Sequence, residues 1–231
     1  MADEKMRRLF LCRHGKTEAN EKESWCGGTS DSPLAETGKK QALLLGKALK
    51  GYYGFHGKLI ISSTRERARE TAKIIAGVLR PSPLMMVMEN LREIDIGQWD
   101  GKSKEEVKKL FPEEYEEWQE GILEPTFRFN GGESMEEVQK RIQKCFRNIQ
   151  RIWLGNKDKK FQDIIVVAHS GTNVMILSEI ISIEMKAYGF RTFKQDNTCV
   201  NIIGFREKKD WHPEMQILLV NSTHHLSSMA K

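Results

Sequence analysis

The sequence contains little cysteine and no long apolar run. Its four cysteines, among 231 residues, are far apart and include no Cys-x-x-Cys pair. None lies beside a pair of histidines at zinc-binding spacing, so the pattern does not match a structural zinc site. A chain of this length buries enough surface to fold without disulfides, so we expect reduced thiols and no metal site.

Membrane and export signals are also missing. No stretch approaches the ~18 consecutive apolar residues that a membrane-spanning helix requires. The N-terminus turns acidic directly after Met1-Ala2, and it lacks both the apolar core and the small-residue cleavage site of a signal peptide. These absences predict a cytoplasmic protein with no membrane partner.

The chain has only a small excess of positive charge, with 37 Lys and Arg residues and 32 Asp and Glu residues. Basic and acidic residues alternate within segments such as 104–109, which is typical of a solvated helix face and not of a nucleic-acid-binding stripe. The hydrophobic content of 39% is that of an ordinary globular protein. We therefore expect one domain over residues 1–231 and no nucleic-acid partner. The oligomeric state is left open, with a homodimer as one option.

Strand-like and helix-like segments alternate along the chain. Short apolar segments typical of strands occupy residues 7–12, 58–62, 84–88, 163–168, 199–205 and 215–220. Apolar residues recur at helical spacing in residues 37–50, 134–152 and about 172–183. A further helix is predicted after the second strand, capped by Ser63 or Thr64 and ended by Pro81. This alternation predicts an α/β fold, namely a three-layer αβα sandwich with a mostly parallel sheet and helices on both faces.

The alternation is interrupted between about residues 84 and 130. Two short helices are predicted there, one after the capping box Ser103-x-x-Glu106 and one after Pro112. We interpret residues from about 102 to 130 as a small helical lid inserted into the domain.

A few side chains carry weaker signals. Trp118 and Phe127 belong to the predicted lid, and we expect them either to contact substrate or to pack the lid. His224 and His225 lie near the C-terminus, where we expect a frayed segment.

Histidine follows two of the predicted strands. His14 ends the first strand in Arg13-His14-Gly15, and His169 ends the 163–168 strand in His169-Ser170-Gly171. Ligands of open α/β sheets bind at the carboxyl ends of the strands, so we expect both histidines to face one crevice. A glycine close after each histidine lets the backbone turn sharply beside a ligand.

Charged residues near these histidines suit a phosphate group. Arg13 lies beside His14, and Arg67 lies early in the helix after the second strand. Guanidinium groups bind phosphate oxygens through paired hydrogen bonds. A neutral imidazole can attack phosphorus and form a phosphohistidine, and a carboxylic acid must then protonate the leaving oxygen. Glu93, in the loop after the third strand, is the best-placed candidate for that acid.

Each of these residues also has a structural interpretation when taken singly. A histidine at a strand end is often only hydrogen-bonded there, and Arg67 could pair with Glu66 or Glu70 on a helix surface. Glu93 could hold a neighbouring arginine such as Arg92 or Arg80. The combination of these residues favours the phosphate site more than any one of them.

Ordered motifs run through most of the chain. The segment Leu11-Cys12-Arg13-His14-Gly15-Lys16-Thr17-Glu18-Ala19-Asn20 is similar to the pattern L-x-R-H-G-x-T-x-x-N. Further similarity occurs in residues 31–38, 62–72, 91–101, 131–134 and 167–169. In this order the motifs resemble the histidine phosphatase superfamily, the phosphoglycerate-mutase-like phosphatases. They cover the chain from about residue 9 to 205, which is far more specific than Arg-His-Gly alone.

The resemblance implies a phosphoglycerate-mutase-like fold and a phosphatase whose partner is a small-molecule phosphate ester. His14 would be the phosphorylated nucleophile, and Glu93 would act first as general acid and then as base. The phosphoryl group would be surrounded by Arg13, Asn20, Arg67 and His169. Because these fixed donors and charges stabilise the phosphoryl oxygens, the resemblance implies neither a metal nor a cofactor.

Two positions depart from the family's pattern. Cys26 stands where many relatives carry Gln, so a polar contact to phosphate or substrate would be missing there. Ser170 takes the place of a glycine in the commoner His-Gly-Gly and adds a hydroxyl group beside His169. Both are candidate substrate-binding residues, and we expect them to affect the choice of substrate more than the chemistry.

Two other functions stay open. A phosphoglycerate mutase would return the phosphoryl group from His14 to another hydroxyl of the sugar acid, but Thr17, Ala19 and residues 91–101 are of the phosphatase-like kind. A non-catalytic module that binds phosphorylated ligands would be expected to have lost catalytic residues, and none is lost. The sequence therefore favours a metal-independent phosphatase of small phosphomonoesters.

Overall fold

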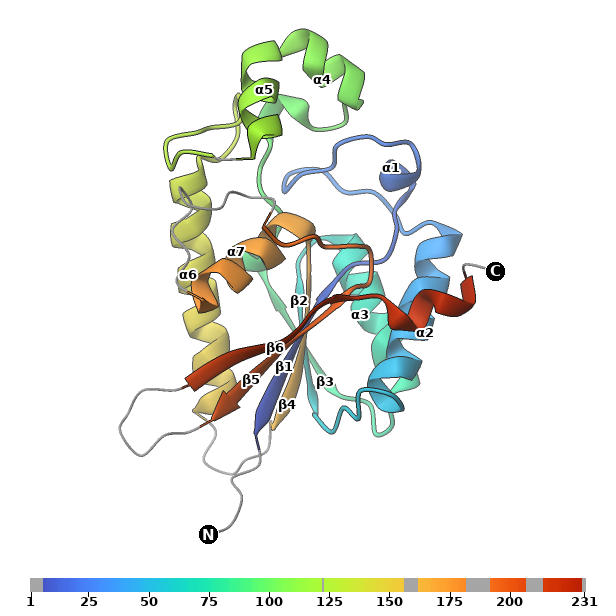
Figure 1. Ribbon diagram of the computed structural model, residues 1–231. Helices are drawn as coiled ribbons and strands as arrows, with labels where there is room; N and C mark the ends of the chain where they lie inside the picture. Colours follow the sequence, from blue (N-terminus) through green and yellow to red (C-terminus); the bar gives the residue numbers. More distant parts are fainter. Residues whose placement is uncertain (1–5, 122, 156–161, 182–191, 207–213, 230–231) are drawn as a thin grey trace.

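A six-stranded sheet with the order β3-β2-β4-β1-β5-β6 forms the centre of the molecule (Figure 1). The computed structural model describes residues 6–121, 123–155, 162–181, 192–206 and 214–229. The strands are β1 (Arg7–Arg13), β2 (Leu59–Ser63), β3 (Leu84–Met88), β4 (Asp163–Ala168), β5 (Val200–Arg206) and β6 (Glu214–Ser222). Parallel pairings join β3, β2, β4 and β1, whereas β5 runs antiparallel to both β1 and β6. The prediction of a mostly parallel sheet is confirmed.

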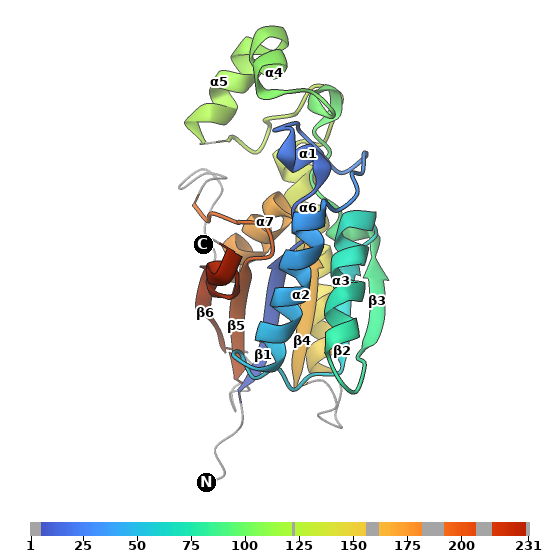
Figure 2. The same ribbon diagram turned by 90° about the vertical axis from the view of Figure 1, so that its right-hand side faces the viewer.

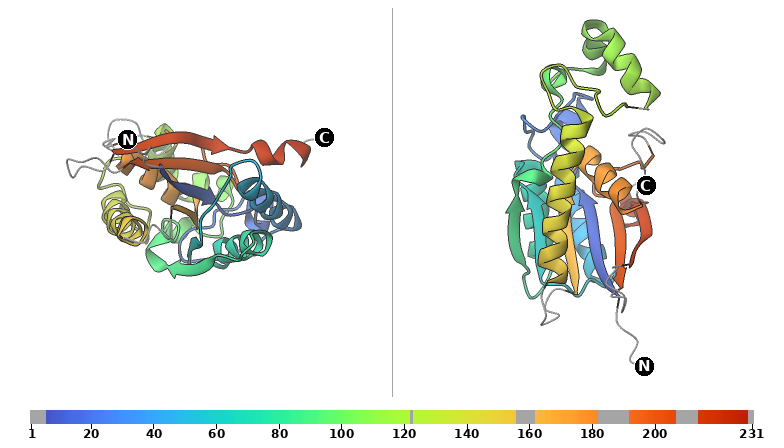
Figure 3. Two further views of the ribbon diagram at one scale, coloured as in Figure 1. Left: turned by 90° about the horizontal axis from the view of Figure 1, so that it is seen from below. Right: turned by 90° about the vertical axis from the view of Figure 1, so that its left-hand side faces the viewer.

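Helices cover both faces of this sheet (Figures 2 and 3). α2 (Glu36–Lys50) and α3 (Glu66–Val78) pack on one face. α6 (Met135–Leu154) and α7 (Ser170–Ile180) pack on the other. The predicted three-layer αβα sandwich is thus confirmed. Residues 182 and 183, the end of the helix expected over 172–183, lie outside the described residues.

The apolar side chains of β1 pack on both faces of the sheet. Leu9 and Leu11 belong to the core beneath α6 and α7, whereas Phe10 and Cys12 belong to the core beneath α2 and α3. Successive side chains of a strand point to opposite faces, so a strand covered on both sides must be apolar throughout. This pattern places β1 in the interior of the sheet. The candidate nucleophile, His14, directly follows β1.

The helix starts agree with the capping signals in two places. Ser134 caps the N-terminus of α6, and Ser103 caps that of α4 (Lys104–Leu110), each through the predicted capping box with the glutamate three residues later. The prediction for α3 is wrong, because this helix begins at Glu66 and neither Ser63 nor Thr64 caps it.

A distant carboxylate caps α3 instead. The Asp31 carboxylate accepts hydrogen bonds from the backbone N–H groups of Glu66 and Arg67. These N–H groups have no partner within the helix, and Asp31 reaches them from a loop 35 residues earlier. A cap that comes from so far along the chain has no local sequence signal.

The segment predicted as a lid lies beyond the carboxyl ends of the parallel strands. α4 and α5 (Pro112–Glu120) project there, together with the short helix α1 (Glu18–Glu21) (Figure 1). Trp118 of α5 packs edge-to-face against Trp25, with ring centroids 4.8 Å apart, and against Trp99 at 6.0 Å. Three tryptophans thus join α5 to the loop after α1 and to the short helix η2 (Gly97–Trp99), which follows η1 (Glu89–Leu91).

The expectation of a frayed C-terminus is wrong for residues 224–229. They form a short helix, η3 (His224–Met229), in which the His224 ring stacks on Tyr52 at 4.8 Å. The His225 Nε2 lies 3.2 Å from the Thr198 hydroxyl. These contacts hold the segment against α2 and against the turn before β5.

Candidate active site

The two strand-end histidines lie next to each other. β1 and β4 are parallel neighbours in which Arg13 pairs with Ala168, so the residues that follow, His14 and His169, leave the sheet together. Their ring centroids are 5.1 Å apart. The structure therefore brings both histidines to one place at the carboxyl end of the sheet, as we expected.

The backbone around His14 requires a glycine. A Cβ atom on Gly15 would lie 2.5 Å from the carbonyl oxygen of Gly38, in the first turn of α2. Only glycine permits this approach. The Gly15 N–H donates to the Thr71 hydroxyl (3.0 Å), which fixes the turn against α3.

A backbone contact sets the tautomer of His14. Its Nδ1 lies 2.8 Å from the carbonyl oxygen of Gly15, and this oxygen can only accept. A neutral ring therefore carries its proton on Nδ1 and keeps the lone pair on Nε2. This is the arrangement that a nucleophilic imidazole needs.

Arg67 sets the opposite tautomer in His169. The Arg67 Nε–H donates to His169 Nδ1 at 3.3 Å, so a neutral His169 carries its proton on Nε2. That Nε2 is buried and has no hydrogen-bond partner among the described residues. A buried donor of this kind calls for an acceptor. A phosphoryl oxygen between the two rings would provide one.

Arg67 also holds the loop that leads to α2. Its guanidinium donates to the Asp31 carboxylate (3.0 Å) and to the carbonyl oxygens of Gly27 (2.8 Å) and Ser30 (3.1 Å). The side chain is only 1% exposed, so the interpretation of Arg67 as a surface ion-pair partner of Glu66 or Glu70 is wrong. Glu66 pairs with Arg69 and Lys73.

Glu93 lies at the N-terminus of α7. Its two carboxylate oxygens accept from the N–H groups of Gly171 and Thr172, each at 3.1 Å. The first N–H groups of a helix are free to bind a carboxylate, and the helix dipole favours negative charge there. Glu93 is therefore anchored right beside His169 and does not pair with Arg92, which instead binds Glu133 at 2.8 Å.

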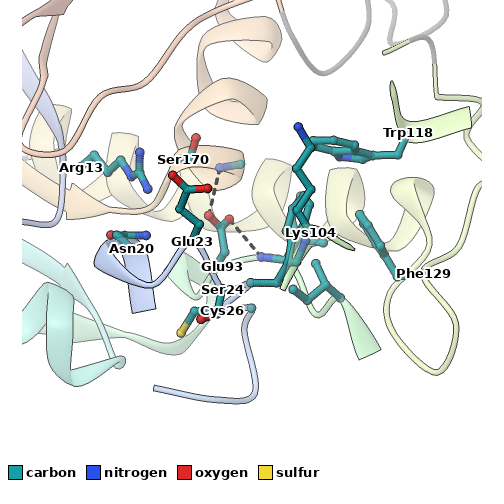
Figure 4. A pocket seen from close by; sticks show the side chains of 15 residues that line it. Arg13, Asn20, Glu23, Ser24, Cys26, Glu93, Lys104, Trp118, Phe129 and Ser170 are labelled. Carbon is teal, nitrogen blue, oxygen red and sulfur yellow. Dashed lines mark hydrogen bonds between the residues drawn. The ribbon is translucent and has the colours of Figure 1, made fainter. Parts of the chain in front are cut away.

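Arg13, Asn20 and Ser170 complete the polar part of the site (Figure 4). The Arg13 guanidinium donates to the carbonyl oxygen of Gln195 at 2.7 Å, and its Nε has no partner among the described residues. The Asn20 side-chain oxygen accepts from the N–H of Thr17 (3.2 Å), and Asn20 lines the cavity. Ser170 is the first residue of α7 and lines the same cavity.

Cys26 also lines the cavity, as expected for the position that departs from the family's pattern. Its sulfur accepts from the Arg67 guanidinium at 3.3 Å and lies 3.4 Å from the Ser30 hydroxyl. Burial raises the pKa of the Cys26 thiol, so it stays protonated at neutral pH.

The segment before β5, for which the sequence predicted no role, supports the backbone of the site. The carbonyl oxygen of His14 accepts from the Thr198 N–H (3.1 Å) and the Asn197 amide (3.3 Å). Asn197 also donates to Asn20, and Gln195 forms a buried amide network with Asn173 and Asn201. The only local signal is the polar run Gln195-Asp196-Asn197-Thr198 directly before an apolar strand.

These side chains surround a cavity of about 450 Å³. Arg13, Asn20, Cys26, Glu93 and Ser170 line it, together with the apolar side chains of Trp25, Ile94, Ile96, Trp118 and Phe129. His14, Arg67 and His169 are almost fully buried and do not themselves line the cavity. Arg67 contacts two residues that do, Cys26 and Gly27. Of the two aromatic residues expected in the lid, Trp118 lines the cavity, whereas Phe127 is buried against Phe129.

The described residues contain no cluster of three or more His, Cys, Asp or Glu side chains that could hold a metal ion. In the same part of the chain, no helix is both long and apolar enough to cross a membrane.

Burial keeps both histidines neutral. It lowers the pKa of His14 well below the ordinary value, and the positive charges of Arg67 and Arg13 lower it further. The pKa of His169 is lowered in the same way, first by burial and then by Arg67, His14 and Arg13. The nucleophile is therefore available without deprotonation at neutral pH.

We expect the two rings to stay neutral well below pH 6.5. A histidine of ordinary pKa would be about 90% protonated at pH 5.5, whereas His14 and His169 should be protonated to a smaller extent there because their pKa values are lowered. An NMR titration of the imidazole signals, assigned with His14→Ala, measures this in the free protein. A midpoint for His14 at or above 6.5 would contradict the prediction.

The same lowered pKa values affect stability. The unfolded chain takes up protons near pH 6.5 and the folded protein does not, so the free energy of unfolding should fall as the pH drops from about 6.5 toward the lowered pKa values. Urea unfolding at pH 7 and at pH 5.5 measures the difference.

The fold and the site together define a class: α/β proteins in which histidines at the ends of two parallel strands form a site suited to a phosphate group. The chain matches the model of the histidine phosphatase superfamily (branch 1) over residues 9–216. It therefore belongs to the histidine phosphatase superfamily, as its motifs indicated. Its relatives include proteins named as phosphatases and as probable phosphoglycerate mutases.

Individual relatives differ in what they are named for. The chain is 31% identical to phosphoserine phosphatase 1 of Hydrogenobacter thermophilus, over 96% of this chain and 95% of that protein. It is 34% identical to a probable phosphoglycerate mutase, GpmB, of Photorhabdus laumondii, over 66% of this chain and 67% of that protein. The solved structure of a mycobacterial glucosyl-3-phosphoglycerate phosphatase has the same fold, with a TM-score of 0.79 and 22% identity over 95% of this chain and 100% of that one.

Proposed function

We propose that the protein hydrolyses small phosphomonoesters through a phosphohistidine on His14, without a metal ion. The observation that carries the proposal is the complementary pair of tautomers. Gly15 leaves His14 Nε2 with a lone pair, and Arg67 leaves His169 Nε2 with a proton that lacks an acceptor among the described residues. One ring is suited to attack phosphorus, and the other is suited to donate to a phosphoryl oxygen.

The reaction has two steps. His14 Nε2 attacks phosphorus, the ester P–O bond breaks, and the leaving oxygen takes a proton from the Glu93 carboxylic acid. In the second step the Glu93 carboxylate removes a proton from water, the water oxygen attacks phosphorus, the P–N bond to His14 Nε2 breaks, and inorganic phosphate leaves. The negative charge on the phosphoryl oxygens is balanced by Arg13, Arg67 and His169, with Asn20 and Ser170 as further hydrogen-bond partners.

The experiment is phosphate release from a panel of small phosphomonoesters, measured with a chelator present. Hydrolysis that survives the chelator would support the proposal. Binding of the esters without turnover would contradict it and favour a non-catalytic binding module.

Phosphoglycerate mutase activity is the second candidate, because of the 34% identity to a probable phosphoglycerate mutase. The same phosphohistidine would then pass its phosphoryl group to a second hydroxyl instead of to water. A coupled assay with 3-phosphoglycerate separates the two functions. Isomerisation faster than hydrolysis would favour the mutase.

A further inference from the structure

One loop, residues 26–31, supplies most of the acceptors of the Arg67 guanidinium, and we call it the arginine loop. Four of its residues accept hydrogen bonds from Arg67: Cys26 through its sulfur (3.3 Å), Gly27 (2.8 Å) and Ser30 (3.1 Å) through their carbonyl oxygens, and Asp31 through its carboxylate (3.0 Å). The conformation of the arginine loop therefore fixes the position of the guanidinium. The Nε–H group that sets the tautomer of His169 depends on the same position.

Asp100, the residue directly after η2, holds the arginine loop from outside. Its Oδ1 accepts from the Gly27 N–H (2.9 Å) and from the Ser30 hydroxyl (2.6 Å). Its Oδ2 accepts from the Ser30 N–H and from the Thr29 hydroxyl, each at 3.0 Å. An ionised carboxylate has about four lone-pair sites, so donors of the arginine loop occupy all of them.

Two residues connect the Asp100 carboxylate to the Arg67 guanidinium. Gly27 donates its N–H to Asp100, and its carbonyl oxygen accepts from Arg67. Ser30 makes the same two backbone contacts. A shift of either N–H away from Asp100 would therefore move an acceptor of Arg67.

Cys26 adds a third connection. The Ser30 hydroxyl donates its proton to Asp100, so its oxygen must accept in the contact of 3.4 Å with the Cys26 sulfur. The thiol thus donates to Ser30 and accepts from Arg67 at 3.3 Å. Burial raises the pKa of this thiol, which agrees with the arrangement because only a protonated thiol can donate.

Asp100 is ionised at neutral pH. Burial acts to raise the pKa of its carboxyl group, but the hydrogen bonds from Ser30, Gly27 and Thr29 outweigh this effect and lower the pKa below its ordinary value. An asparagine could not make the same contacts, because its NH2 group is a donor and would face two of the four donors of the arginine loop.

The start of the lid is fastened to the same region. The Gly101 N–H donates to the Trp25 carbonyl oxygen, and the Trp25 N–H donates to the Lys102 carbonyl oxygen, both at 2.9 Å. Trp25 directly precedes the arginine loop, and its ring packs against Trp118 of α5. The segment that carries Asp100 is therefore joined both to the arginine loop and to the lid.

We infer that Asp100 is a positioning residue, which acts through the arginine loop to place Arg67 and to hold the proton of neutral His169 on Nε2. Asp100 is not among the residues that line the cavity, so it acts without contact with the ester. Its effect on hydrolysis rests on the proposed function. Its effects on Arg67 and His169 belong to the free protein and can be measured without a reaction.

The first test is the tautomer of His169, which heteronuclear NMR of the imidazole nitrogens measures, with the signals assigned by His169→Ala. In the wild type the proton should be on Nε2. In Asp100→Asn the Arg67 Nε–H should no longer hold Nδ1 as an acceptor, so the two nitrogen signals should move toward each other as the tautomers mix. A residue that only stabilised the fold would leave them in place in a folded variant.

The second test is calorimetric binding of inorganic phosphate. Loss of one charge-assisted hydrogen bond weakens binding by about tenfold or more, so we expect the Kd to rise by about tenfold in Asp100→Asn. The value of kcat/KM should fall by a similar factor for alkyl and for p-nitrophenyl esters, because Arg67 would bind the phosphoryl group of both. This equal loss distinguishes Asp100 from a general acid.

Glu106→Gln is the matched control. Glu106 is also a carboxylate near the start of the lid, and it accepts from a backbone N–H, that of Ser103, at 2.7 Å. In the described part of the chain its hydrogen bonds go to Ser103 and not to the arginine loop. This variant should match the wild type in the His169 signals, the phosphate Kd and kcat/KM.

Wild-type His169 signals and a wild-type phosphate Kd in folded Asp100→Asn would overturn the inference. If Asp100→Asn does not fold, Ser30→Ala decides, because it removes the shortest of the four hydrogen bonds to Asp100. Movement of the His169 signals toward each other would then support the inference, and unchanged signals would overturn it. A wild type that hydrolyses no ester would defeat the proposed function alone, since the tautomer and the phosphate affinity still test Asp100.

Discussion

Replacement of His14 by alanine should lower phosphate release by on the order of 10⁴-fold or more. The methyl group cannot attack phosphorus, while Arg13, Arg67, His169 and Glu93 stay in place to bind the ester. We therefore expect kcat to fall and ester binding to persist, because the His14 side chain supplies the bond-forming lone pair. Steady-state kinetics together with calorimetric binding measures both effects.

A phosphoenzyme provides the independent readout. The wild type, quenched during turnover of a radiolabelled ester, should carry label that acid removes and alkali does not, as expected for phosphohistidine, and His14→Ala should carry none. His56→Ala is the control, since His56 is exposed and outside the cavity, and it should behave like the wild type. Retention of more than a tenth of the activity in His14→Ala would rule out His14 as the nucleophile.

Replacement of Glu93 by glutamine should lower kcat for an alkyl phosphate by about 10²- to 10⁴-fold. The amide keeps the size of the side chain but can neither give up a proton to the leaving oxygen nor take one from water. One of the two N–H groups of α7 that bind the carboxylate loses a good acceptor as well.

The choice of ester separates the two roles of Glu93. p-Nitrophenolate leaves without a proton, so Glu93→Gln should still transfer the phosphoryl group from p-nitrophenyl phosphate to His14. Water attack would stay slow, and we expect a burst of one p-nitrophenolate per enzyme followed by a slow steady rate. Glu89→Gln, in the short helix η1 that precedes Glu93 and outside the cavity, should show the kinetics of the wild type. An equal loss for alkyl and p-nitrophenyl esters, without a burst, would show that Glu93 is not the general acid.

The arrangement of strands and helices was predictable because its signals are local. The apolar run of β1 marks a strand covered on both faces, and the capping boxes at Ser103 and Ser134 mark two helix starts. The position of histidine directly after two such strands also indicated that both rings would meet. Parallel strands end at one edge of a sheet, so this conclusion needed only the strand assignments.

Other features come from residues far apart in the sequence. The α3 cap at Asp31 and the support of His14 by Asn197 and Thr198 join segments that only folding brings together. The C-terminal helix η3 is a similar case, because its histidines are held by Tyr52 and Thr198. None of these contacts leaves a periodic or motif signal in its own segment.

The sequence alone thus determined the fold class and the superfamily, and it pointed to the candidate residues of the site, since these depend on local patterns and on ordered motifs. The tertiary structure decided the tautomers of His14 and His169, the burial that lowers their pKa values, and the orientation of Glu93 on α7. It also brought the Asp100 carboxylate to the loop that holds Arg67. Hydrogen bonds and burial depend on which atoms lie close together in space, and the order of residues along the chain does not specify this.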